Sequence, residues 1–257
     1  MLLKNEKIML RKYRESWDSF AYKNALWAVL TEHKTYRITE FFKSGQIEID
    51  NILEFLKNLG LTYQKDRALD FGCGVGRLTR AMSKYFKEVI GVDISQKMIS
   101  LAKAHNLKCK NCRFVLNEKD DLSLFKSNSF SFIYCVRTLQ HLEPSLTEKY
   151  LKEFIRLLKP KGILVFQIPS VPTFYPKGII IRIFPEILLN ILRGGGFYNL
   201  INTMSLRGVP MMEMHGIKPE EIKRILKKQK AKLLSLFKDD LSGSGWVSYR
   251  YIVSKKY

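Results

Sequence analysis

Hydrophobic and polar positions follow two alternating patterns along residues 47–169. In one, apolar residues recur three and four positions apart, as at Ile49, Ile52 and Leu56; in the other they form a short run, as in the sequence RALDF. The first pattern predicts amphipathic helices, and the second predicts strands that are buried on both faces. Such strands, alternating with helices, are typical of a parallel sheet that helices cover on both sides.

The same patterns continue toward the end of the chain and predict seven strands in all. Helices are expected over residues 47–59, 76–86, 95–105, 145–158 and 218–228, and strands over residues 67–71, 88–93, 113–117, 130–136, 163–169, 231–237 and 246–254. The short sequence DDLSGSG between the last two strands predicts a hairpin, so the last strand should run antiparallel. The predicted fold class is α/β, with a doubly wound seven-stranded sheet that contains one antiparallel strand.

We expect residues 1–257 to form a single domain with four parts. These are an N-terminal helical segment (1–45), a core (46–169), an inserted cap (170–215), and a C-terminal helix and β-hairpin that complete the sheet (216–257). The N-terminal segment has aromatic residues in helical turns and is expected to pack over the ligand-binding edge of the sheet. The cap interrupts the alternation with several prolines, three consecutive glycines and an apolar run.

The composition is ordinary for a globular protein except for its charge. Of the 257 residues, 46% are hydrophobic and 26% are charged, which excludes a disordered, collagen-like or coiled-coil chain. The chain has 44 basic and 24 acidic residues, and the resulting net charge of +20 is spread along its length. A basic surface attracts nucleic acid, anionic lipid or an acidic substrate. A lysine-rich surface without a specific partner is the alternative.

Neither the cysteines nor the apolar segments indicate a secreted or membrane-spanning protein. Four cysteines are too few for a disulfide scaffold, and no uncharged apolar stretch reaches the ~18 residues that a membrane span needs. The first residues lack the cleavage site of a signal peptide. We therefore expect a cytoplasmic protein. Cys109 and Cys112 form a lone C-x-x-C pair, for which we expect no metal or redox role.

The chemically informative stretch is the turn between the first core strand and the next helix. It contains Asp70, Gly72, Gly74, Gly76 and Arg77 in the sequence DFGCGVGR, at the edge where open parallel sheets bind ligands. An arginine stands where the dinucleotide-binding fingerprint requires its third glycine. A fixed carboxylate beside a pyrophosphate is repulsive, whereas beside a cation it is attractive. The turn therefore favours S-adenosylmethionine (SAM), which carries an ammonium and a sulfonium, over NAD.

A second carboxylate is expected at the tip of the neighbouring strand. Asp93 follows Gly72 by 21 residues, about the interval that places a carboxylate against both ribose hydroxyls of a bound nucleoside. The alternative for Asp93 is a helix N-cap. Ile94 and Met98 supply either an apolar face for adenine or ordinary core contacts.

Four sequence segments together resemble the class I SAM-dependent methyltransferases of the methyltransferase-domain superfamily. They are ALDFGCGVGRLTRAM, VIGVDISQKMISLAKAH, SFSFIYCVRTLQHLEP and LLKPKGILVFQIP, and they cover roughly residues 66–170. The resemblance implies the Rossmann-like methyltransferase fold, SAM as the methyl donor and S-adenosylhomocysteine (SAH) as the product.

The resemblance also implies which residues would hold the donor. By position, Asp70, Gly72 and Gly74 correspond to residues around the methionine portion, Asp93 to the ribose ligand, and Ile94 to the residue beside adenine.

Two further positions come from the same resemblance. Asn117 and Glu118 occupy the usual glycine–aspartate pair at the adenine amino group, so either side chain could make that contact. Cys135 and Val136 match the position whose backbone meets the donor's ammonium group.

The acceptor side is less defined. Methyl transfer needs a base only if the acceptor must lose a proton. His141 is placed to act as that base, with a packed structural histidine as the alternative; His215 is a second candidate, and Arg137 could bind an anionic acceptor. An apolar acceptor pocket, a subdomain core or a helix resting on a membrane surface could be formed by the cap residues Tyr175, Ile179–Ile181, Phe184, Leu188–Leu189, Phe197 and Met211–Met212.

Three functions are therefore compared. The leading one is methyl transfer to a small-molecule acceptor such as a metabolite, sugar or lipid-like compound. An RNA methyltransferase is the first alternative because of the net charge, but the sequence YCVRTLQH lacks the Asn/Asp-Pro-Pro-Tyr/Phe motif of amino-directed base methylation. The second alternative is a non-catalytic binding protein of the same fold. Peripheral membrane contact stays open.

Overall fold

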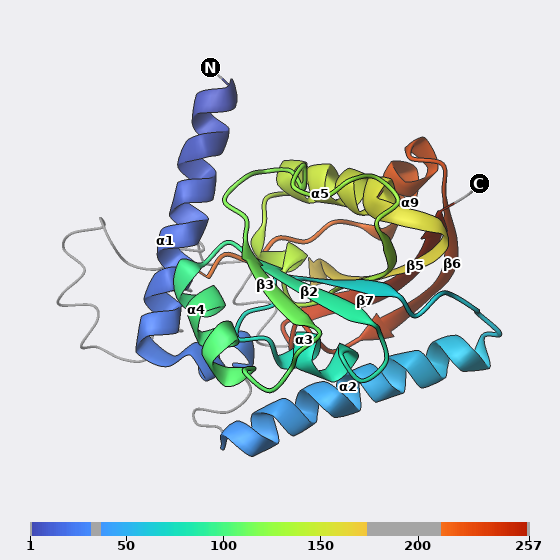
Figure 1. Cartoon of the computed structure of the whole chain (residues 1–257). Helices are drawn as coiled ribbons and strands as arrows, with labels where there is room; N and C mark the ends of the chain where they lie inside the picture. The colour runs from blue at the N-terminus through green and yellow to red at the C-terminus, as the bar shows by residue number, and fades with distance from the viewer. Residues whose placement is uncertain (1, 32–36, 174–211, 256–257) are drawn as a thin grey trace.

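The computed structural model of the chain describes residues 2–31, 37–173 and 212–255, and within them one seven-stranded sheet lies between helices (Figure 1). The strands are β1 (Arg67–Phe71), β2 (Glu88–Asp93), β3 (Cys112–Leu116), β4 (Phe130–Cys135), β5 (Leu158–Pro172), β6 (Ala231–Asp239) and β7 (Trp246–Lys255). The helices are α1 (Leu2–Val29), α2 (Ile38–Asn58), α3 (Arg77–Met82), α4 (Gln96–His105), α5 (Pro144–Leu157) and α9 (Pro219–Lys228), with a short 3₁₀ helix at Leu139–His141.

The sheet has the predicted topology. Its strand order is β3-β2-β1-β4-β5-β7-β6, and β7 runs antiparallel to both of its neighbours, β5 and β6. The chain runs outward from β1 to β3 and then returns to β4 beside β1. The predicted α/β class with a doubly wound sheet and one antiparallel strand is confirmed, and the reversal of direction lies between β1 and β4, where open sheets of this kind bind ligands.

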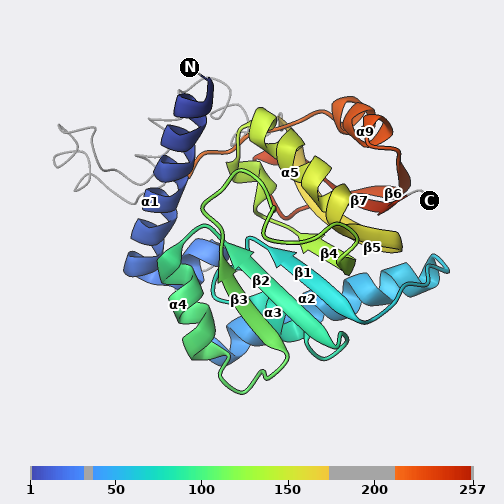
Figure 2. The same cartoon turned by 45° about the horizontal axis from the view of Figure 1, so that its top comes forward.

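Helices cover both faces of the sheet (Figure 2). On one face, α5 and α9 pack through residues such as Phe154 and Ile222 against the strands. On the other, α2 and α3 pack through residues such as Ile52 and Met82. The strands are apolar on both sides because both sides are buried, which is the pattern that made them recognisable in the sequence.

Several elements differ in length from their predicted ranges, and α3, for example, ends at Met82 rather than at residue 86. Helix α2 begins at Ile38 rather than at residue 47, because Phe41 and Phe42 are buried and extend its apolar face. Strand β5 is longer than predicted at both ends, because Leu158 already pairs with Phe130 of β4 and Pro172 still pairs with Trp246 of β7.

Helix α1 lies beside α4 in both views (Figures 1 and 2). Ala21 and Ala28 of α1 pack with Phe41 of α2 and with Met98 of α4 in a separate apolar cluster. The same cluster includes Val75, which belongs to the loop after β1. Met98 is thus a core residue, and α1 is held next to the carboxyl edge of β1 and β2.

Three other expectations concern the cap, the cysteines and membrane-spanning helices. The cap residues from Tyr175 to Met211 lie outside the described residues, and only Met212 of that set is described. Cys109 and Cys112 are joined by a disulfide, which the sequence analysis did not anticipate. Among the helices of the described ranges, none is long and apolar enough to cross a membrane.

Candidate functional site

The loop after β1 turns sharply into α3 and is attached to the neighbouring strand. Gly72, Gly74 and Gly76 all have positive φ angles, of 76°, 52° and 83°. The N–H groups of Gly72 and Cys73 both donate to the carbonyl oxygen of Val92, at 2.8 and 3.0 Å. Residues other than glycine adopt this backbone region at a cost, so the turn explains the glycine spacing.

All three of these glycines are also closely covered, and a Cβ atom at Gly76 would lie 2.6 Å from Nδ2 of Asn106. A Cβ atom at Gly72 would overlap the side chain of Thr138, which follows β4, and one at Gly74 would lie 2.6 Å from Cγ2 of Val29 in α1. The loop after β1 is thus in contact with the segment after β4 on one side and with α1 on the other.

Asp93, at the end of β2, holds this loop from the side. Its Oδ2 accepts the N–H of Gly74 at 2.8 Å, and its Oδ1 accepts the N–H of Ser95 at 2.9 Å. Burial raises the pKa of the Asp93 carboxyl, while these backbone hydrogen bonds oppose the rise. The N-cap of α4 is Ser95, whose hydroxyl accepts the N–H of Met98 at 3.0 Å, so Asp93 is not that cap.

Asp70 is the second carboxylate of the site. It is 2% exposed, and its Oδ2 accepts the hydroxyl of Thr79 at 2.6 Å. Burial raises the pKa of Asp70 to about 7, although the hydrogen bond from Thr79 and the charge of Arg77 oppose this. A buried carboxyl of this kind gains more from a nearby cation than an exposed one, because little water screens it.

Asp18 of α1 is a site residue that the sequence analysis missed. Its Oδ1 accepts the hydroxyl of Ser95 at 2.6 Å and the N–H of Lys97 at 3.0 Å, so α1 caps the first turn of α4. Ser95 and Lys97 follow Asp18 by 77 and 79 positions in the sequence, and no local pattern marks Asp18 for this role. Ile94, between Asp93 and Ser95, is partly buried against the main core.

Asn117 and Glu118, after β3, behave differently from each other. Asn117 is buried, and its amide nitrogen donates to the carbonyl oxygens of Lys119 at 3.2 Å and Asp121 at 2.9 Å. The side chain of Glu118 is 47% exposed and forms an ion pair with Arg14 of α1. Asn117 therefore organises its loop, while Glu118 links that loop to α1.

The end of β4 lies against the end of β1. Cys135 is fully buried with a free thiol, whose pKa burial raises. Two residues further on, Arg137 has a φ angle of 57°, and its N–H donates to Oε1 of Gln167 on β5 at 2.8 Å. The hydroxyl of Thr138 donates to the carbonyl oxygen of Phe71 at 3.2 Å. Side chains from β5 and backbone from β1 thus hold the segment after β4.

His141 is buried, and both of its ring nitrogens have protein partners. Its Nδ1 lies 2.7 Å from the carbonyl oxygen of Glu213 and therefore donates, because a carbonyl can only accept. Nε2 is then the accepting nitrogen and lies 3.1 Å from the side-chain nitrogen of Gln140. The ring of Trp17 packs edge-on at 5.1 Å. His215, the second candidate, lies 3.4 Å from the Glu213 carboxylate.

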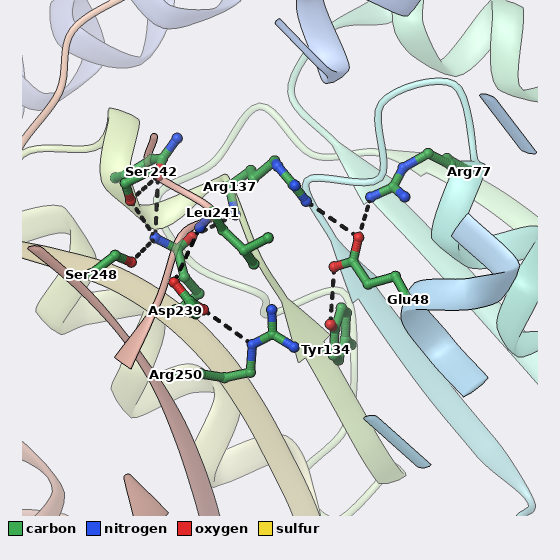
Figure 3. A network of polar contacts seen from close by, with 11 residues as sticks. Glu48, Arg77, Tyr134, Arg137, Asp239, Leu241, Ser242, Ser248 and Arg250 are labelled. Carbon is green, nitrogen blue, oxygen red and sulfur yellow. Dashed lines mark hydrogen bonds and ion pairs between the residues drawn. The ribbon is translucent and has the colours of Figure 1, made fainter. Parts of the chain in front are cut away.

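A buried polar network adjoins the ends of β1 and β4 (Figure 3). Oε2 of Glu48 on α2 pairs with Arg77 at 2.6 Å and with Arg137 at 3.2 Å, and its Oε1 accepts the hydroxyl of Tyr134 at 3.1 Å. Burial alone would raise the pKa of Glu48, but the two guanidinium groups lower it to about 2. The sequence analysis missed Glu48 because its partners are 29 to 89 positions away.

Comparison with known proteins finds methyltransferases among the proteins similar to this chain. Residues 69–166 match the family described as "Methyltransferase domain". A probable methyltransferase of Aspergillus luteorubrus is 32% identical over 151 residues, which are 55% of this chain and 51% of that protein. A demethylmenaquinone methyltransferase of Staphylococcus aureus is 28% identical over 155 residues, 55% of this chain and 63% of that protein. The chain thus spans about half to two-thirds of the length of these curated relatives.

Solved structures share the fold over most of the chain. Magnesium protoporphyrin IX methyltransferase from Synechocystis, solved with bound SAH, has a TM-score of 0.61 at 16% identity and covers 95% of this chain and 98% of its own. A SAM-dependent methyltransferase from Clostridium acetobutylicum has a TM-score of 0.62 at 17% identity, covering 94% and 99%.

The sheet order, the glycine turn after β1 and the carboxylate after β2 define the fold of the class I SAM-dependent methyltransferases. Residues 69–166 match the methyltransferase domain, and the sheet has the strand order of that fold.

Proposed function

We propose that this protein is a SAM-dependent methyltransferase that acts on a small-molecule acceptor. The observation that carries the proposal is a pair of carboxyls, buried Asp70 and partly buried Asp93, at the tips of adjacent strands on either side of a glycine turn. A nucleoside with a positive charge and two ribose hydroxyls fits this pair. A phosphate-bearing cofactor would face repulsion from Asp70, which lies beside the glycine turn.

The donor would be held by residues from four segments. Asp70, Gly72 and Gly74 would surround its methionine portion, with backbone groups at Cys135 meeting the ammonium. Asp93 would accept the ribose hydroxyls. These roles are the ones that the sequence resemblance to the class I methyltransferases implies.

Ile94 and Asn117 would face the adenine. We favour Asn117 over Glu118 for the adenine amino group, because Asn117 is buried and fixed at the end of β3, whereas Glu118 is half exposed and paired with Arg14.

Methyl transfer from a sulfonium to a nucleophile is an in-line displacement, so the protein mainly orients its reactants and excludes water. Orientation of this kind can contribute roughly 7–11 kcal/mol to lowering the barrier. Where the acceptor must lose a proton, we propose His141 as the base. Its accepting nitrogen, Nε2, would have to exchange the side chain of Gln140 for the acceptor's proton.

The names of the relatives support a small-molecule acceptor. One is a demethylmenaquinone methyltransferase, and one structural neighbour is a magnesium protoporphyrin IX methyltransferase. The proposal places the reaction in the cytoplasm. Nucleic acid and a membrane surface remain alternative partners of the basic surface.

Calorimetric titration with SAH, followed by incubation of the protein with methyl-labelled SAM and separated cell fractions, tests the proposal. We expect SAH to bind and label to appear in the small-molecule fraction. Label in RNA would replace this acceptor class with the first alternative. Binding of SAH without label in any fraction would favour a non-catalytic protein, and absence of SAH binding would refute the proposal.

A further inference from the structure

We propose that Glu48 is a positioning residue that fixes the two segments on either side of the donor's methionine portion. The inference rests on the proposed function. Glu48 lies on α2, outside the matched methyltransferase domain, and makes no contact with the residues proposed to hold ribose or adenine. Its contacts instead reach Arg77, which follows the glycine turn, and Tyr134 and Arg137 at the end of β4 and just after it (Figure 3).

On the first side, Glu48 holds Arg77, the first residue of α3, directly after Gly76. Arg77 is 3% exposed, and its Nη2 lies 2.6 Å from Oε2 of Glu48. The stem of Arg77 crosses α2 at Gly45, where a Cβ atom would lie 2.7 Å from the arginine Cγ. This close crossing leaves Arg77 little freedom, so the position of Glu48 sets that of the glycine turn.

On the second side, Glu48 holds the end of β4. Oε1 accepts the hydroxyl of Tyr134, and Oε2 pairs with Arg137 at 3.2 Å. Arg137 has the left-handed backbone conformation described above, and such conformations persist only where surrounding contacts fix them. Glu48 provides one of these contacts through the side chain, and Gln167 provides another through the backbone N–H.

The two sides touch each other at Gly72 and Thr138, with no room for a Cβ atom between them. A small shift of either segment therefore changes the space in which the methionine portion would sit. Glu48 is ionised at every physiological pH, because the two guanidinium groups lower its pKa to about 2. If Glu48 lost its charge, the guanidinium groups of Arg77 and Arg137 would repel each other across a buried gap.

The nucleoside side of the site depends on other contacts. Asp93 binds Gly74 and Ser95, while Asp18 binds Ser95 and Lys97. Loss of the Glu48 charge should therefore affect the amino-acid end of the donor more than its nucleoside end.

A pair of ligands separates these two ends. SAH carries both, whereas 5′-methylthioadenosine has the nucleoside and the sulfur without the amino-acid portion. For Glu48→Gln we expect the calorimetric Kd of SAH to rise about tenfold, the scale of one lost charge-assisted hydrogen bond. The Kd of 5′-methylthioadenosine should stay within about twofold of the unchanged protein's value.

Glu88→Gln is the matched control. Glu88 also pairs with two arginines, Arg67 at 2.8 Å and Arg113 at 3.3 Å, but it begins β2 at the opposite edge of the sheet. This variant should bind both ligands as the unchanged protein does. Arg137→Gln is the second test, for use if Glu48→Gln does not fold. This variant removes one partner of Glu48 and leaves its ion pair with Arg77 in place. It should raise the Kd of SAH about threefold or more and leave the Kd of 5′-methylthioadenosine unchanged.

Equal weakening of both ligands by the folded variant, or no weakening of either, would overturn the role of Glu48. The proposed function would stand in both cases. A protein of unchanged sequence that binds neither ligand would instead refute the proposed function itself.

Discussion

Asp93, at the end of β2, accepts the backbone N–H of Gly74 at 2.8 Å, so the carboxylate that ends the second strand also holds the loop that follows the first. The same carboxylate accepts the N–H of Ser95 at the start of α4. A residue proposed to bind ribose is therefore also part of the scaffold. Substitutions at Asp93 must be judged on stability and on ligand binding together.

Asp93→Ala should lower both the stability of the protein and its affinity for SAH. Removal of the carboxylate leaves the N–H groups of Gly74 and Ser95 without their acceptor, at a cost of about 1–3 kcal/mol in the free energy of unfolding. The Kd of SAH should rise at least about tenfold because the ribose hydroxyls lose a charged acceptor. Urea unfolding and calorimetric titration measure the two effects. An unchanged Kd in the folded variant would remove the ribose assignment.

Gly72→Ala should disrupt the contact between the ends of β1 and β4. The substitution forces an L-residue into positive φ, at about 1–2 kcal/mol, and also displaces Thr138. Gly60→Ala is the control, because Gly60 has a φ of 68° with nothing within 4 Å of the added Cβ.

Gly60→Ala should show the strain cost alone in urea unfolding and leave SAH binding unchanged. Gly72→Ala should be less stable and bind SAH more weakly. Equal behaviour of the two variants would show that the contact with Thr138 does not matter.

Asp70 should make stability and donor binding depend on pH in opposite directions. Its pKa in the folded protein is about 7, above the value of ~3.9 in an unfolded chain. The folded state therefore holds a proton that the unfolded state releases, so the contribution of Asp70 to stability is full below about pH 4 and is lost as the pH rises to about 7.

A cationic donor favours the ionised form of Asp70. Its affinity should accordingly rise between about pH 5.5 and pH 7, with a proton released on binding. Asp70→Asn should flatten both profiles in urea unfolding and calorimetry. A donor affinity that still rises with the same slope in this variant would assign the effect to another group.

His141→Asn should separate catalysis from binding. If the ring is the base, turnover of labelled donor should fall by about 10²- to 10⁴-fold, while the Kd of SAH stays within about twofold. The free energy of unfolding should also fall by about 1–2 kcal/mol, because the variant loses the hydrogen bond that the imidazole N–H donates to the carbonyl oxygen of Glu213. His215→Asn is the comparison, expected to keep its turnover. A loss of stability without a loss of turnover would leave His141 a packing residue.

The sequence predicted the sheet well because strands buried on both faces consist almost entirely of apolar residues. It missed the first turns of α2 because Gly45 looks like an interruption of the helical pattern. In the structure Gly45 is instead the place where the side chain of Arg77 crosses the helix. A distant side chain can thus require a small residue at one position of a helix, and such a requirement leaves no periodic pattern in the sequence.

The same distinction applies to the candidate site. Asp70 and Asp93 stand beside glycines at the ends of apolar runs, and that local context identified them. Glu48 and Asp18 act on partners that only the folded chain brings close, and each stands among other polar residues of a helix. The disulfide between Cys109 and Cys112 was also not predicted, since a lone pair of cysteines gives no information on its oxidation state.

Helix α1 is synthesised well before several of the residues that it contacts in the folded protein. Lys12 pairs with Glu213, which is 201 positions away, and Trp17 packs on His141. Apolar side chains such as Leu10 and Tyr13 must therefore stay without their final contacts until most of the polypeptide has been translated. During that interval the apolar face of α1 is exposed, and exposed apolar surface of this kind is prone to aggregation.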